Sequence, residues 1–235
     1  MSGFFGKPLN WLFIFAGLLL AATTAFVVFK PVRVVPRIAY GPTYQLIDQN
    51  GEPFTDARLH GQVVLYGFGY ISDPTGGLDQ TVDDMRRFWQ AVEAEGLGDQ
   101  VMIVLILFDD QRDTPEQRAA FAREHHLDPE SWVLLGGDAP TLKRVIGQGF
   151  GVYYEQVPLS DLLEDPAVPA EAYGYLQAQR TILVDERNLI RAEYRSPLNL
   201  ERAMRDVRLI IREKNSTGAA RVLNEAAHLF MCYPQ

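Results

Sequence analysis

The sequence predicts an α/β fold, and two patterns along the chain carry that prediction. The run Val101–Phe108 is apolar at every position and lacks the polar alternation of a half-exposed strand. Such a run is typical of a strand covered on both faces, as in the parallel part of an α/β sheet. Predicted strands alternate with segments of helical period, and a hairpin and a helix follow. This order favours a three-layer sandwich with the sheet in the middle.

The first elements of the sandwich are a hairpin, a buried strand and a helix. Tyr44–Ile47 is expected as a strand that enters a tight turn at Asp48–Gly51, because Asn-Gly favours such turns. The apolar, β-branched and aromatic residues of Val63–Tyr70 predict a central strand. A helix follows and ends at Gly96, with these apolar residues on one face: Leu78, Val82, Met85, Trp89 and Val92.

The second half of the chain continues the alternation. Thr114 as N-cap and Pro115 at the first helical position predict a helix that runs to about His126. The later elements are expected as a strand, a helix, a hairpin of two strands and a last helix, at Trp132–Leu135, Pro140–Ile146, Arg180–Asp185, Leu189–Tyr194 and Asn199–Glu213. Together these elements predict a thioredoxin-like three-layer sandwich over residues 43–213.

A long apolar run precedes this domain. After a short N-terminal segment, 1–10, the run Trp11–Phe29 carries no charged side chain, and at about 1.5 Å per residue it is long enough for a hydrocarbon core of about 30 Å. We expect an uncleaved transmembrane anchor, followed by a proline-containing tether over 30–42. A cleaved signal peptide is the alternative. The basic residues after the run would keep the domain in the cytoplasm by charge counting, although long domains often translocate regardless.

Composition excludes some function classes. The formal net charge is −8, from 22 Lys and Arg against 30 Asp and Glu. Binding to nucleic acid needs clustered basic residues, which the chain lacks, so we expect no nucleic-acid partner. Cys232 is the single cysteine, which excludes an intrachain disulfide.

Five short motifs occur in a characteristic order along the domain. They are Asp48–Phe54 (DQNGEPF), Gly69-Tyr70, Asp109–Pro115 (DDQRDTP), Phe150–Tyr154 (FGVYY) and Leu183–Asp185 (LVD). In these motifs and their spacing the chain resembles the Sco/SenC family, the membrane-anchored copper chaperones of cytochrome oxidase assembly. The resemblance covers about Thr43 to Glu213, and it implies the thioredoxin-like fold and an exported domain.

The resemblance also implies a metal site, made in the family by two cysteines of one loop and one histidine. The matching positions hold Asp73, Gly77 and Gln177. Copper needs thiolate and imidazole ligands, and these residues supply one carboxylate, no side chain and one amide. We therefore expect a degenerate member without metal, cofactor, catalytic residue or small-molecule substrate.

Two acidic stretches receive a structural interpretation. Asp73 begins an Asp-Pro-Thr-Gly-Gly turn, and Asp79 is placed to cap or favour the start of the helix that follows. In the stretch Asp109–Arg112, the arginine is expected to pair with a carboxylate and brace the loop above the strand end.

The C-terminal extension, residues 214–235, carries an apolar helical stripe. Its candidate partner-binding residues are Val222, Leu223, Leu229, Phe230 and Met231. Two arrangements stay open: the stripe packs on its own domain, or it docks as a helix in the groove of a neighbour.

These observations predict a non-catalytic accessory or stabilising subunit of a membrane respiratory or photosynthetic electron-transfer complex. The anchor would place it in the bacterial inner membrane, with the domain on the periplasmic side. One alternative is a transient assembly factor for a cytochrome oxidase or a related complex. Another is a redox or metal enzyme with an unrecognised site around Asp73, Asp79, Asp110 and Gln177.

Overall fold

The computed structural model describes residues 8–29, 33–163, 169 and 171–230. The chain divides into two compact units, one formed by Val35–Asn215 and the other by Met1–Val34 with Ser216–Gln235. The larger unit holds the predicted α/β domain, and the smaller one holds the first and last helices. Each unit is described by itself.

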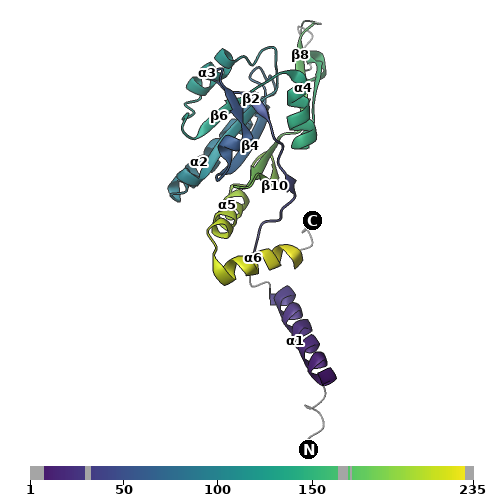
Figure 1. Ribbon diagram of the computed structural model, residues 1–235. Coiled ribbons are helices and arrows are strands. Elements are labelled where there is room, and N and C mark those ends of the chain that lie inside the picture. The colour runs from purple at the N-terminus through teal and green to yellow at the C-terminus, as the bar shows by residue number, and fades with distance from the viewer. Residues whose placement is uncertain (1–7, 30–32, 164–168, 170, 231–235) are drawn as a thin grey trace, which may run out of the picture. The chain divides into compact units, whose positions relative to one another are not determined.

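A six-stranded sheet in the order β1-β10-β9-β4-β5-β6 forms the centre of the larger unit (Figure 1). Strands β4, β5 and β6 are parallel, whereas β9, β10 and β1 join by antiparallel pairing. The strands of this sheet are β1 (Ala39–Tyr40), β4 (Val63–Gly69), β5 (Val101–Leu107), β6 (Trp132–Leu135), β9 (Arg180–Val184) and β10 (Leu189–Arg195).

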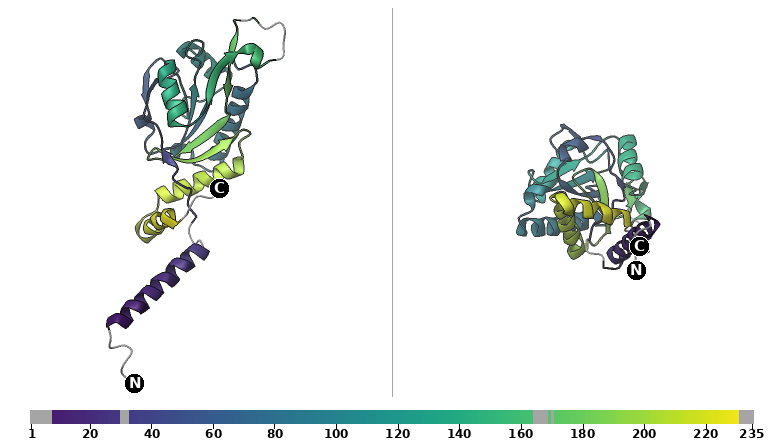
Figure 2. Two further views of the ribbon diagram at one scale, coloured as in Figure 1. Left: turned by 90° about the vertical axis from the view of Figure 1, so that its right-hand side faces the viewer. Right: turned by 60° about the horizontal axis from the view of Figure 1, so that its bottom comes forward.

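Helices and hairpins cover the two faces of this sheet, and the turned views of Figure 2 show the twisted strands between these layers. One face packs against α2 (Gly77–Ala94), α3 (Pro115–Glu124) and α5 (Leu200–Lys214). The other face packs against the remaining elements: the hairpin β2 (Gln45–Ile47) and β3 (Pro53–Thr55), the helix α4 (Ala139–Leu142) with the π-helical turn η3 (Lys143–Gly149), and the hairpin β7 (Tyr154–Pro158) and β8 (Tyr173–Gln177). This arrangement confirms the predicted three layers.

Short 3-10 turns complete the domain at η1 (Asp56–Leu59), η2 (Gly98–Gln100) and η4 (Leu159–Asp161). The predicted entry hairpin, the central strand, the helix capped by Thr114 and the closing hairpin with its helix are all confirmed. The predicted helix Pro140–Ile146 is split, because its second half continues as the π-helical turn.

The hairpin of β7 and β8 is a structure that the sequence analysis missed. Its strands pair antiparallel, with Tyr154 opposite Gln177, and form a two-stranded sheet separate from the main one. Tyr154 and Tyr175 are buried in the apolar cluster on the second face of the main sheet. The hairpin is therefore attached to the domain by its aromatic side chains.

Two glycines allow α2 to lie close to β4. A Cβ atom at Gly67 would come within 2.4 Å of the Met85 sulfur, and one at Gly69 within 2.6 Å of Leu78 Cδ1. Side chains at these positions would push the helix away from the strand. The close packing fixes where the loop between β4 and α2 emerges, and this loop carries Asp73.

A buried arginine fastens the beginning of the domain. Arg191 is 2% exposed and lies 2.6 Å from Asp185 and 2.6 Å from Glu213. It also donates to the Val35 carbonyl oxygen at 2.6 Å. The expected tether over 30–42 is therefore corrected in its second half, where β1 pairs with β10 and belongs to the sheet.

The smaller unit contains α1 (Pro8–Phe29) and α6 (Gly218–Phe230). Helix α1 contains the whole apolar run that the sequence analysis interprets as an anchor. Judged by length and apolarity together, none of the helices in the described residues qualifies as a membrane span.

Candidate functional site

The three positions that match the family's metal ligands lie together in the structure. Asp73 is in the loop after β4, Gly77 is the first residue of α2, and Gln177 is the last residue of β8. The side-chain amide of Gln177 donates to Asp73 Oδ2 at 3.2 Å. A Cβ atom at Gly77 would lie 2.8 Å from the same oxygen. The missed hairpin is thus the element that brings Gln177 to the loop.

The Asp73 carboxylate organises this loop. Its Oδ1 accepts hydrogen bonds from the Thr75 backbone N–H at 2.9 Å and from the Thr75 hydroxyl at 2.6 Å. Its Oδ2 accepts from the Leu78 N–H at 3.1 Å in addition to Gln177. Leu78 lies in the first turn of α2, where backbone N–H groups have no partner within the helix. Asp73 therefore caps the helix from outside it, while Asp79 lies in the first turn, where a carboxylate complements the helix dipole.

A second glutamine, Gln179, completes the cluster, and the sequence analysis did not identify it. A Cβ atom at Gly77 would lie 2.0 Å from the Gln179 amide nitrogen. The space that a side chain at position 77 would need is therefore filled by Gln179. The signal in the sequence is weak, because only Gln177 stands at a position that the resemblance assigns to a metal ligand, and Gln179 does not.

The donor set of this cluster does not fit copper. A soft Cu(I) ion needs thiolate, thioether or imidazole ligands. Both oxygens of Asp73 already accept hydrogen bonds, Gly77 offers no donor, and the Gln177 amide nitrogen is not a metal ligand of that kind. Across the part of the chain that the structure describes, no three His, Cys, Asp or Glu side chains group as a metal site.

An aromatic layer lies beneath the cluster. Tyr70 stands edge-on to Tyr175, with their ring centroids 5.1 Å apart, and Phe108 stacks on Tyr154 at 4.4 Å. The Tyr70 hydroxyl accepts a hydrogen bond from the Tyr175 N–H at 3.2 Å. Burial raises the pKa of Tyr70 to about 12, from an ordinary value that already leaves the phenol neutral at physiological pH. These rings hold the hairpin of β7 and β8 against the ends of β4 and β5.

The predicted arginine brace is confirmed next to this layer. The Arg112 Nε donates to the Asp109 carboxylate, which is buried at the end of β5. The Tyr173 hydroxyl donates to the other Asp109 oxygen at 3.2 Å, and the Arg112 guanidinium lies 4.0 Å from the centroid of the Tyr173 ring. The brace therefore joins the loop after β5 to the hairpin that carries Gln177.

Asp113 connects the loops that follow the two central strands. Its carboxylate accepts from the Ile71 N–H at 3.1 Å and from the Asp109 N–H at 3.3 Å. Burial, followed by the nearby negative charge of Asp109, raises the pKa of Asp113 to about 7. This carboxyl group thus titrates near neutral pH.

The residues of the alternative enzyme site are only partly brought together. Asp73 and Gln177 share a hydrogen bond, but Asp110 accepts from the Ala139 N–H at 3.3 Å, at the start of α4. Asp79 is exposed on the first turn of α2.

The predicted partner-binding residues lie on or after α6. Val222 is 69% exposed and Leu223 is 44% exposed. Leu229 and Phe230 fall within the helix, and Met231 lies outside the described residues. Two large apolar side chains of the predicted stripe, Val222 and Leu223, are therefore exposed to solvent on this helix.

Comparison with known proteins decides the family. Residues 35–212 match the sequence model described as SCO1/SenC. The chain belongs to the SCO1/SenC family. The match begins at the segment held by Arg191 and includes β1, in agreement with the extent of the larger unit.

Two curated relatives give the scale of the sequence likeness to this SCO1/SenC member. A protein of Stutzerimonas stutzeri named "Putative copper-binding protein" is 29% identical over 174 residues, which cover 72% of this chain and 76% of that protein. An SCO2-like protein of Rickettsia prowazekii is 28% identical over 141 residues, which cover 60% of this chain and 65% of that protein.

Solved structures confirm the Sco-type thioredoxin-like fold. The structure of Bradyrhizobium japonicum ScoI with copper bound has a TM-score of 0.59 at 26% identity, and the match covers 73% of this chain and 99% of that one. Arabidopsis thaliana ScoI with copper bound has a TM-score of 0.61 at 21% identity, and the match covers 74% and 99%. The second likeness concerns the fold alone.

Replacing Asp73 with alanine tests the organising role of its carboxylate in this SCO1/SenC member. Asp73→Ala removes the cap of α2 and the contact with Gln177, so we expect it to lower the free energy of unfolding by about 2 kcal/mol. Urea unfolding of the full chain measures the change. Asp79→Ala, in the first turn of α2 and without these contacts, is the control and is expected to cost less than about 1 kcal/mol. Equal losses in the two variants would contradict the assignment.

The raised pKa of Asp113 predicts a specific dependence of stability on pH. An unfolded aspartate loses its proton near pH 3.8 and the folded Asp113 near pH 7, so between these values the folded state binds the extra proton. Its contribution to stability is therefore full below about pH 4 and is lost as the pH rises to about 7. Relative to Asp113→Asn, the wild type should lose about 2 kcal/mol of stability between pH 5 and pH 8. Urea unfolding at both pH values measures this, and parallel profiles for the two proteins would contradict it.

Proposed function

We propose that the chain is a non-catalytic accessory or stabilising subunit of a membrane electron-transfer complex, in which the Sco-type domain acts as a protein-binding scaffold. One observation carries the proposal. At the positions that match the family's ligands, Asp73 uses both carboxylate oxygens for internal hydrogen bonds, and Gln179 fills the space beside Gly77. The loop is thus held by protein groups in the place where the resemblance implies a metal.

The chemistry around the cluster supports a scaffold rather than an enzyme. The tyrosine nearest to the cluster has its pKa raised by burial, and the neighbouring acids, Asp109 and Asp113, are engaged with Arg112 and with backbone N–H groups. An enzyme of the covalent type needs a nucleophile in hydrogen-bond reach of a base. The groups in this cluster serve instead to fix two loops and one hairpin.

The surface beside the cluster supports a protein partner. Leu176 is 51% exposed and directly precedes Gln177, and Tyr153 is 53% exposed. The Tyr153 carbonyl oxygen accepts from the Ala178 N–H at 2.9 Å, so the two side chains belong to neighbouring parts of the same hairpin region. Exposed aromatic and aliphatic side chains on a rigid support are typical anchors of protein interfaces.

Membrane attachment and location are further parts of the proposal. The charge-free run Trp11–Phe29 supports an anchor in the bacterial inner membrane. The family resemblance supports a domain on the periplasmic side. A respiratory or photosynthetic complex is the partner that suits such a position.

Copurification from solubilised membranes tests the proposal. A tagged full-length chain should comigrate with haem-containing subunits in the mature complex, at a constant ratio to haem absorbance. Replacing the exposed apolar pair, in Tyr153→Ser with Leu176→Asp, should reduce the copurified haem at least fivefold. Tyr40→Ser is the matched control. Tyr40 is an 80% exposed aromatic residue on β1, an edge strand of the main sheet outside the hairpin of β7 and β8.

The outcomes separate the candidate functions. A chain that runs alone, free of haem subunits, would contradict the role of a stable subunit. A chain found only with assembly intermediates and absent from the mature complex would favour the transient assembly factor.

A further inference from the structure

Strand β6 forms one edge of the main sheet, and one of its outward N–H groups is held by a side chain. The register with β5 pairs Val133 with Val104 and Leu134 with Leu105. In a parallel pair, alternate residues direct their N–H groups away from the neighbouring strand. The Leu134 N–H donates to the side-chain oxygen of Gln49 at 3.0 Å. A side-chain amide thus takes the position that the carbonyl of a further strand would occupy.

The chain itself pairs with this edge at one point, next to the end of β6, and then turns away from it. Ile47 and Gly136 form an antiparallel bridge. The Ile47 nitrogen lies 2.8 Å from the Gly136 oxygen, and the Gly136 nitrogen lies 2.9 Å from the Ile47 oxygen. Two residues further along an antiparallel pair, the backbone of Gln49 would face Leu134. The chain turns away instead in a tight turn, in which the Gly51 N–H donates to the Asp48 backbone carbonyl oxygen at 3.2 Å. Beyond the bridge, the Gln49 side chain therefore takes the Leu134 N–H, and the Asp128 carbonyl oxygen takes the Trp132 N–H at 2.8 Å.

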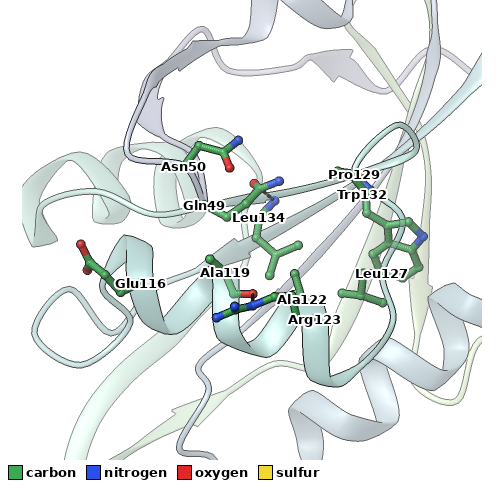
Figure 3. A pocket seen from close by; sticks show the side chains of 10 residues that line it. All are labelled: Gln49, Asn50, Glu116, Ala119, Ala122, Arg123, Leu127, Pro129, Trp132 and Leu134. Carbon is green, nitrogen blue, oxygen red and sulfur yellow. Dashed lines mark hydrogen bonds between the residues drawn. The ribbon is translucent and has the colours of Figure 1, made fainter.

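A groove runs along this edge between β6 and α3 (Figure 3), with a volume of about 470 Å³. Its lining includes the buried apolar residues Leu127, Trp132 and Leu134. Arg123 lies on the α3 side, and its Nε donates to the Ala119 carbonyl oxygen at 3.2 Å. The lining carries two charged side chains, Glu116 and Arg123, and Arg123 supplies its positive charge.

We propose that this groove binds an extended peptide segment of a partner protein as an added strand, antiparallel to β6. The peptide backbone takes over the Leu134 N–H from Gln49, and an acidic side chain of the peptide pairs with Arg123. Addition of a strand supplies main-chain hydrogen bonds for affinity, and pockets for alternate side chains supply specificity. This mode needs backbone groups at a sheet edge that an added strand can take over. On β6 the Leu134 N–H is held only by the Gln49 side chain, which a peptide can displace, whereas the Trp132 N–H keeps its bond to the Asp128 carbonyl oxygen. The site is separate from the Asp73 cluster and does not depend on the proposed function.

Gln49 gives the proposal a specific signature. In this arrangement its side chain competes with the peptide for the Leu134 N–H. Removing the competitor in Gln49→Ala should tighten peptide binding by roughly three- to tenfold, the equivalent of one net hydrogen bond. If Gln49 only lined the groove, Gln49→Ala would leave peptide binding unchanged or weaken it.

A displayed library of random seven-residue peptides, selected on the immobilised full-length chain, supplies the probe. Enriched peptides, labelled and measured by fluorescence anisotropy, are expected to carry an acidic residue between apolar ones. Arg123→Glu should weaken their binding at least tenfold, and exchange of the peptide acid for lysine should restore it. Arg144→Glu is the matched control, because Arg144 is an exposed arginine of the π-helical turn η3, outside this groove.

Three results would overturn the proposal. One is a library without enrichment over an uncoated surface. Another is a set of enriched peptides that bind Arg123→Glu and Gln49→Ala as they bind the wild type. The third is a dimer of the chain that Arg123→Glu dissociates, because the occupant of the groove would then be a second copy.

Discussion

The burial of β4 and β5 on both faces is the constraint on which the rest of the structure depends. The two strands are buried almost throughout, and so are the residues that follow them directly, Tyr70, Phe108 and Asp109. Backbone groups buried at this end of the sheet need protein partners. Asp113 does this for the Ile71 and Asp109 N–H groups, and the Arg112 brace neutralises the buried Asp109. The two loops and the hairpin of β7 and β8 therefore behave as one connected platform at this end of the sheet.

The Asp73 cluster is an extension of the same principle. A carboxylate that caps α2 and also receives the Gln177 amide fixes the loop from two directions without any bound ion. Asp73 is partly buried, and four donors hydrogen-bond to its carboxylate, which offsets the cost of removing it from water. This hydrogen-bonded cluster is the reason why we propose a protein-binding role for this member of the SCO1/SenC family.

Sequence patterns predict the layers of this protein well and its site incompletely. The apolar run of β5, the cap at Thr114 and the turn before β3 are local signals, and the structure confirms each of them. The hairpin of β7 and β8 has no comparable signal, because its burial depends on aromatic contacts with strands distant in sequence. Gln179 was missed because its neighbour Gly77 is distant in sequence. The capping of α2 by Asp73 was missed because the residue lies in the loop before the helix.

A competition titration with Cu(I) tests the central claim most directly. The full-length chain with Cys232→Ser, which removes the single thiol, is titrated under reducing conditions against Cu(I) held by a coloured chelator. The hydrogen-bonded cluster predicts that the chelator keeps its copper and its absorbance at equimolar chelator and protein. Transfer of one equivalent of copper to the chain, abolished by Asp73→Ala, would contradict the account, because the cluster would then be a working metal site.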